Sequence, residues 1–197
     1  MVVLTLGLLI FFAIHSVPMQ GRLRSGLIER FGEGAYKGIF SLISAVGLVL
    51  IVLGYAKLQG HPTKNPEIWF PPIWMRHLTL LLMLPAMILL VSAYVPSRIR
   101  TMTKHPMLAA IKLWALGHLL ANGDLGSIVL FGSFLAFAIV DRISLKQRHA
   151  PGPLGDRSGS LAGDLTAVVV GVALYAALLL FAHAWLFGVA PVPRLSM

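Results

Sequence analysis

Long apolar stretches separated by short polar and basic segments form the dominant pattern of this chain. A hydrocarbon core about 30 Å thick is crossed by about 20 residues of α-helix, so these stretches predict membrane-spanning helices. Six are expected, over residues 2–19, 36–58, 78–94, 107–121, 125–140 and 165–189. The sequence therefore predicts an all-α fold, a polytopic transmembrane helical bundle of about six spans that forms one domain over residues 1–197.

The fourth and fifth stretches are short for this thickness. They are joined only by Asn122-Gly123-Asp124, which is a turn sequence, and Asp124 is a good N-cap for the helix that follows. We therefore expect a tight transmembrane hairpin, with a re-entrant pair buried in the bundle as the alternative.

Basic residues fall mainly on alternate connections between the apolar stretches. Of the 16 Lys and Arg residues, twelve lie between residues 22 and 37, 98 and 112, and 142 and 157, and four lie on the other side. Because cytoplasmic connections carry the excess of Lys and Arg, this bias predicts periplasmic N- and C-termini in a bacterial inner membrane. The stretch 141–164, rich in Pro, Gly and Ser, is expected to be a flexible cytoplasmic connection.

Composition narrows the possible chemistry. The chain is 57% hydrophobic and 12% charged, against about 25% charged in soluble domains, so its partner is the lipid bilayer. The net charge of +9 follows the membrane topology, and nucleic-acid binding is not expected because no soluble basic domain is present. With no cysteine, any metal or haem must be held by His, Met, Tyr or carboxylates.

Histidines inside the apolar stretches are the candidate functional residues. His15, His118 and His183 lie within predicted spans, and His77 lies at the start of one. Ionisable groups are costly there and usually face the bundle interior, where they bind a ligand or bond a neighbouring helix. A haem between two helices needs two imidazoles, for which His15 and His118 are candidates. The rival group, His77 with His118 and His183, would suit a small metal ion or a periplasm-facing haem.

The fourth stretch has two distinct faces at helical spacing. Trp114 and His118 are one turn apart on one face, which could line a flat aromatic cavity such as a porphyrin needs. His105 and Lys112 are two turns apart on roughly the opposite face, where the charge could reach the membrane surface or pair with an anionic headgroup or propionate.

Several short motifs resemble those of the NnrU family of bacterial membrane proteins. They are Thr103-Lys104-His105-Pro106, the run from Leu113-Trp114 through His118 to Asn122-Gly123-Asp124, the pair His15-Ser16, and Gly34-Ala35-Tyr36. The resemblance covers nearly the whole chain. It implies a role in nitrogen-oxide metabolism, because the family is named from genes near denitrification clusters and is linked to making nitrite and nitric oxide reductases.

The family also resembles the 15-cis-zeta-carotene isomerase, a membrane haem b protein. By that resemblance His15 and His118 are the axial metal ligands, since one ligand lies in a His-Ser pair and the other thirteen residues after a His-Pro motif. Trp114, His105 and Lys112 would complete the haem-binding residues. Ala115 replaces the cysteine of the isomerase, so its redox ligand exchange cannot operate here.

Three functions follow from the residues and the resemblance together. The first is a haem b membrane protein that acts in redox or nitrogen-oxide metabolism with a redox partner. The second is a cofactor-free assembly or regulatory factor for nitrite and nitric oxide reductases. The third is an enzyme, a cis–trans isomerase of a carotenoid or another hydrophobic polyene.

Overall fold

Helices make up the regular structure of the described part of the chain. A computed structural model describes residues 1–149, 154–155 and 157–192, and among these it contains no β-strand. The chain divides into two compact units, Met1–Phe70 with Gly123–Leu145 and Pro71–Asn122 with Lys146–Met197. Each is described by itself below. The all-α class is confirmed, and the single domain stays a prediction.

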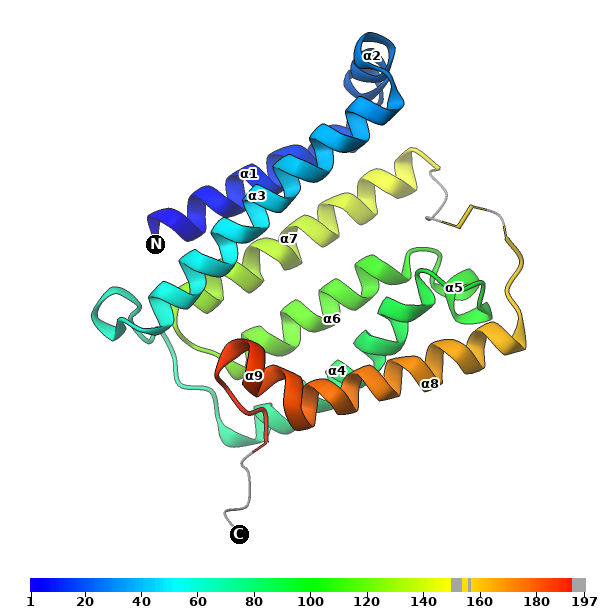
Figure 1. Ribbon diagram of the computed structural model, residues 1–197. Coiled ribbons are helices and arrows are strands. Elements are labelled where there is room, and N and C mark those ends of the chain that lie inside the picture. The colour runs from blue at the N-terminus through cyan, green and yellow to red at the C-terminus, as the bar shows by residue number, and fades with distance from the viewer. Residues whose placement is uncertain (150–153, 156, 193–197) are drawn as a thin grey trace. The chain divides into compact units, whose positions relative to one another are not determined.

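The first unit is built on a pair of long helices that run side by side (Figure 1). Its elements are α1 (Val2–Ser16), the 3₁₀ turn η1 (Val17–Met19), α2 (Gly21–Phe31), α3 (Glu33–Gln59), the 3₁₀ turn η2 (Pro62–Lys64) and α7 (Leu125–Gln147). Helix α2 lies in the segment expected to be a basic connection. The segment is basic as expected, but it is helical, because its arginines alternate with Leu23, Leu27 and Ile28, which form an apolar stripe at helical spacing.

Glycines bring α1 and α3 into close contact. An added Cβ at Gly54 would lie 2.4 Å from the backbone nitrogen of Leu4, and one at Gly7 would lie 2.6 Å from that of Ile51. Leu4 is fully buried at this crossing. Small residues allow backbones to approach in this way in membrane bundles, where packing holds helices together in place of the hydrophobic effect.

Substitution of Gly54 tests this contact. We expect Gly54→Ala to lower the free energy of unfolding by about 1–3 kcal/mol, since the new methyl group would force the two backbones apart. Gly132→Ala on α7 is the matched control, because nothing lies within 4 Å of its Cβ position. Thermal unfolding of the purified chain in detergent measures both, and equal melting temperatures would contradict the close packing.

A buried network of polar side chains lies at the N-terminus of α7. The Asp124 carboxylate accepts hydrogen bonds from Ser127 N–H (2.9 Å) and Ser127 Oγ (2.5 Å), which confirms Asp124 as the N-cap. It also accepts from Asn65 Nδ2 (2.7 Å) and Gln59 Nε2 (3.2 Å). Asn65 Oδ1 in turn accepts from Gly126 N–H (2.7 Å). The network thereby joins the end of α3 and the segment that follows it to the beginning of α7.

The second unit is built around α4. Its elements are α4 (Ile73–Ser92), α5 (Arg98–Thr103), α6 (Pro106–Ala121), α8 (Leu161–Ala177), the π-helical segment η3 (Leu178–Ala182) and α9 (His183–Phe187). Helix α4 packs against both α6 and α8 (Figure 1). Gly117 on α6 and Gly171 on α8 allow these approaches, since an added Cβ would lie 2.8 Å from Met83 and 2.6 Å from Ile88.

The observed helices overlap the six expected stretches and correct the length of one of them, while the number of membrane spans stays a prediction. Among the described residues, five helices are long and apolar enough to cross a membrane, and the shorter apolar helix Pro106–Ala121 is the sixth. The fifth expected stretch was too short, because α7 continues through Asp141 to Gln147. The same extension shortens the connection predicted over 141–164. Asn122–Gly123 is the point where the chain passes from one unit to the other, and the hairpin stays a prediction.

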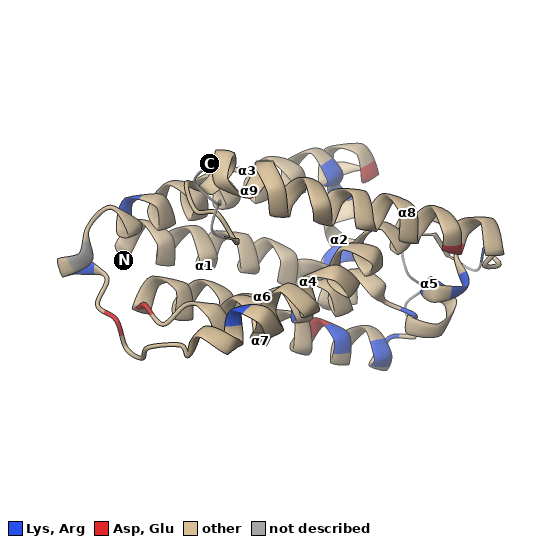
Figure 2. Ribbon diagram, turned by 90° about the horizontal axis from the view of Figure 1, so that it is seen from below, with Lys and Arg blue, Asp and Glu red and all other residues tan. Residues whose placement is uncertain are grey.

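The outer surfaces of these helices suit lipid. Leu9, Leu42, Leu81 and Phe181 each expose 64–67% of their surface. Charged residues lie mainly near helix ends, and α1 carries none along its length (Figure 2). Large apolar side chains of this exposure are compatible with a bilayer and would form an oversized apolar patch in water. The orientation of the termini stays a prediction.

Candidate functional site

Helix α6 places His118 one turn after Trp114, as the sequence predicts. The helix begins at Pro106 and ends before Asn122, whose side-chain amide donates to the carbonyl of His118 (2.8 Å). The Trp114 and His118 rings lie 5.3 Å apart between centroids. The preceding residue, Gly117, fixes this part of α6 against α4, since its carbonyl accepts from the Thr79 hydroxyl (2.7 Å). The two rings contact each other on one face of α6, and a role of this face in lining a porphyrin cavity stays a prediction.

One nitrogen of the His118 ring is fixed by its own helix. Nδ1 lies 2.8 Å from the carbonyl oxygen of Trp114. Because a carbonyl oxygen only accepts hydrogen bonds, Nδ1 carries the proton, and Nε2 of the neutral ring carries the lone pair. Metal-bound histidines are held in this way, with one ring N–H donated to a carbonyl.

His183 lies at a break in the regular helix of the same unit. The π-helical segment Leu178–Ala182 separates α8 from His183. Such segments are rare in proteins, and those that occur often lie at functional sites. Its Nδ1 is bonded to the carbonyl oxygen of Val189 (2.7 Å), so its Nε2 carries the lone pair. Phe187, one turn later, packs against the ring at 5.0 Å. His183 is therefore held as His118 is, with a defined tautomer.

The structure brings the rings of His118 and His183 together. Their centroids are 6.4 Å apart and their planes differ by 19°. Two imidazoles bound on opposite sides of one metal, with bonds of about 2.0 Å and ring centres about 1.1 Å beyond each nitrogen, would have centroids roughly 6.2 Å apart. The centroid separation is close to this distance, and binding of a metal or haem iron by the two rings stays a prediction.

His77 does not complete a three-histidine site. It lies on the exposed surface of α4, and no group of three or more His, Cys, Asp or Glu residues that could hold a metal ion occurs in the part of the chain that the structure describes. The predicted rival group is thus reduced to the pair His118 and His183. A bare metal ion would need further ligands, whereas a haem supplies four nitrogens of its own.

His15 lies in an aromatic environment in the first unit. Its ring stacks on Phe11 at 4.0 Å and contacts Phe40 of α3 at 5.1 Å and Phe137 of α7 at 6.3 Å. Its Nδ1 is bonded to the carbonyl oxygen of Phe11 (2.7 Å), which gives it the same tautomer as His118. His15 and His118 belong to different units, and their pairing as axial ligands stays a prediction.

His105 and Lys112, predicted on the basic face of α6, lie at the beginning and in the middle of the helix. His105 directly precedes the helix as its N-cap, and its carbonyl accepts from Ala109 N–H (3.2 Å). Lys112 lies in the middle of α6 and is half-buried. A role for either residue in holding a propionate stays a prediction.

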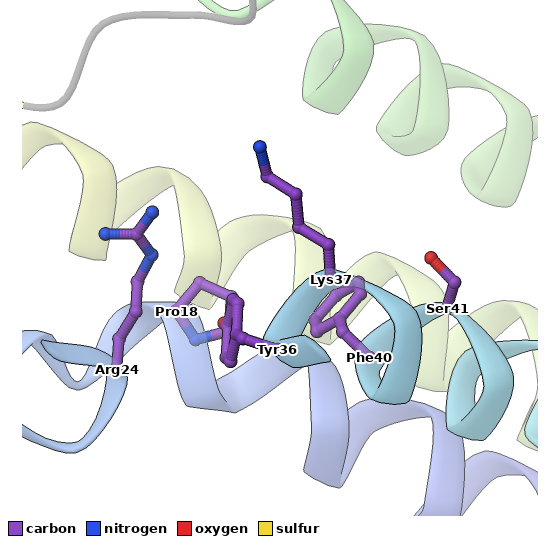
Figure 3. A pocket seen from close by; sticks show the side chains of 6 residues that line it. All are labelled: Pro18, Arg24, Tyr36, Lys37, Phe40 and Ser41. Atoms are coloured by element: carbon purple, nitrogen blue, oxygen red, sulfur yellow. The ribbon is translucent and has the colours of Figure 1, made fainter. Parts of the chain in front are cut away.

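Sequence reasoning missed two features that the structure shows. Arg100, counted only as a connection charge, is buried and donates to the carbonyl of Gly155. The second is a cavity of about 210 Å³ in the first unit, which Figure 3 shows from close by. Four cations and a tyrosine between residues 22 and 37 were the signal for this cavity, but they were interpreted only as a topology signal.

Comparison with known proteins identifies one family. The family described as NnrU protein matches residues 3–191, which is nearly the whole chain. Searches of curated proteins and of solved structures found no match.

Proposed function

Because this chain belongs to the NnrU family, we propose that it is a membrane haem b protein of that family in which His118 is an axial ligand. The observation that carries the proposal is the pair of imidazoles at 6.4 Å, each with Nδ1 fixed on a carbonyl and Nε2 as the lone-pair nitrogen. Trp114 would pack against the macrocycle. When bound, the haem supplies one-electron chemistry, and the chain's own residues supply ligation, orientation and a water-poor surrounding.

The second axial position has two candidates. His183 is supported by its contact with His118 in the same unit, and His15 is supported by the family resemblance. We place His183 there because its ring is already at the separation that two axial ligands require. His15 would then serve the aromatic packing among α1, α3 and α7.

Optical spectroscopy of ligand variants tests this function. We expect the chain, purified with haem supplied, to give a Soret band of a six-coordinate low-spin haem. His118→Ala should abolish that spectrum, and His183→Ala should convert it to a five-coordinate one. His61→Ala is the matched control, because His61 makes the same Nδ1 bond to a carbonyl, that of Lys57, but is exposed.

The outcomes distinguish the two candidates for the second ligand and test whether haem binds at all. If His15→Ala and not His183→Ala changes the coordination state, the second ligand is His15 and the haem function stands. If pyridine extraction finds no haem in the purified chain and none binds on reconstitution, the haem proposal is wrong. The alternative left would be a cofactor-free factor that assists assembly of nitrite and nitric oxide reductases.

The cellular role follows from the family alone. We place the chain in the bacterial inner membrane, in redox or nitrogen-oxide metabolism with a redox partner, as the NnrU resemblance implies. Carotenoid isomerisation has less support, because Ala115, at the position of the isomerase cysteine, is fully buried and offers no thiolate.

A further inference from the structure

The cavity in the first unit lies where α2 meets the beginning of α3. It is lined by Pro18, Arg24, Tyr36, Lys37, Phe40 and Ser41, and Figure 3 shows Arg24 and Lys37 extending from different helices with Pro18 and Tyr36 between them. Its volume of about 210 Å³ is several times the roughly 30 Å³ that one water occupies in the liquid. It can therefore hold a group of several heavy atoms.

The tyrosine in this cavity has an unsatisfied hydroxyl. Tyr36 Oη is buried and has no hydrogen-bond partner among the described residues. Burying a hydroxyl without a partner costs about 1–3 kcal/mol, so native structures usually satisfy such groups. This oxygen therefore indicates that the cavity receives a polar group from outside the chain.

Positive charge surrounds that hydroxyl. The Arg24 guanidinium carbon lies 5.9 Å from the centroid of the Tyr36 ring. Among the described residues Arg24 forms no ion pair within 4.0 Å, and the carboxylate that acts on it electrostatically is that of Glu33. Lys37 forms an exposed pair with Glu33 at 2.8 Å, but an ammonium has three donors and can bind a second anion. Two cations and a phenolic donor against one carboxylate favour an anionic ligand, above all a phosphate.

The surroundings of the cavity are those of a membrane interface. Helix α2 has arginines and an apolar stripe, as interfacial helices do. It connects two predicted spans. Phe40 and Pro18 give the cavity an apolar side, and Ile39 and Leu42, next to the lining residues of α3, are 48% and 67% exposed. A ligand with a phosphate at one end and hydrocarbon at the other suits both parts.

From these contacts we propose that the cavity binds the headgroup phosphate of an anionic phospholipid, with Arg24 and Lys37 as the cations and Tyr36 Oη as a hydrogen-bond donor. The acyl chains lie along the lipid-facing surface of α3. No step of this proposal depends on the histidines or on haem.

Native mass spectrometry of the full chain in detergent, titrated with phosphatidylglycerol or phosphatidylcholine, tests the site. We expect preferential retention of phosphatidylglycerol and about tenfold weaker binding for Arg24→Gln and for Tyr36→Phe, the size of one hydrogen bond to a charged group. Tyr36→Phe is the sharpest variant, because it removes a single oxygen and no charge. Arg30→Gln, on the same helix outside the cavity, and Tyr55→Phe, on the same helix as Tyr36, are the controls.

The outcomes separate a built site from general attraction. Equal losses for Arg24→Gln and Arg30→Gln, or unchanged binding for Tyr36→Phe in a variant that keeps its melting temperature, would overturn the proposal. Inorganic phosphate is the second probe. If it alone binds as tightly as the lipid and displaces it with the same dependence on Tyr36, the ligand is a free anion and the lipid assignment is wrong.

Discussion

Asp124→Ala is expected to lower the free energy of unfolding by about 3–5 kcal/mol, because one carboxylate accepts the hydrogen bonds of three side chains and an orphan N–H of α7. Hydrogen bonds to a charged group contribute about 1.5–3 kcal/mol each, and the loss is not fully additive within one network. Asn65 and Ser127 are themselves buried and would be left without this acceptor. Denaturant titration of the detergent-solubilised chain measures the change, with exposed Glu29→Ala as the control.

The pH dependence of the free energy of unfolding tests whether the negative charge of Asp124 causes this stabilisation. Burial raises the pKa of Asp124, but the hydrogen bonds from Ser127, Asn65 and Gln59 together outweigh it and hold the pKa below its ordinary value. A depressed folded-state pKa contributes stability above the unfolded value of about 3.9, and that stability is lost as the pH falls toward the folded pKa. Asp124→Asn should remove this part of the acid loss. An unchanged acid profile in Asp124→Asn would contradict the assignment.

The sequence predicts the apolar helices well because their signal is local. Length, composition and the cost of unsatisfied backbone groups in lipid leave few alternatives to a helix over stretches such as 36–58. The regions whose helices the sequence did not predict are those where this signal weakens. Helix α2 is amphipathic, with charges that resemble those of a connection, and the end of α7 continues as a polar helix through Asp141.

The sequence predicts only the part of the candidate site that depends on local spacing within one helix. Trp114 and His118 share a face because both lie on one helix at a spacing of four residues, which the sequence states directly. The contact of His118 with His183 depends on how α6, α4 and α8 pack and on the π-helical segment before His183, and residue spacing within one helix determines neither. The cavity around Tyr36 likewise depends on the angle at which α2 meets α3.

Gly123→Ala is the second substitution with a large expected effect, because of where an added methyl group would lie. Its Cβ would lie 1.7 Å from the backbone oxygen of Trp69, far inside any real contact distance. The motif Asn122-Gly123-Asp124 suggests a glycine required for turn geometry, but Gly123 does not have positive φ. The requirement is instead a close approach of two backbone segments, since Ile68 N–H donates to the Gly123 carbonyl (2.8 Å) and Leu125 N–H donates to that of Pro66 (3.0 Å).

We expect Gly123→Ala to lower the free energy of unfolding by about 3–4 kcal/mol, from overpacking together with the loss of these two hydrogen bonds. In a chain of this length that corresponds to a decrease of roughly 10 °C in melting temperature. Gly60→Ala, in the same connection, is the control, since its added Cβ would lie 3.9 Å from the backbone oxygen of Lys57, which is an ordinary contact distance. Equal melting temperatures for the two variants would contradict the close approach.

Combining Gly123→Ala with Asp124→Ala tests whether the contact of Gly123 with Trp69 depends on the polar network of Asp124. The segment 65–69 carries both Asn65, which bonds Asp124, and Trp69, which lies against Gly123. If displacing this segment also breaks the Asn65–Asp124 bond, Gly123→Ala and Asp124→Ala remove overlapping interactions, and their combined effect should be smaller than the sum of the two. Strict additivity would show that the connection and the cap of α7 are stabilised independently.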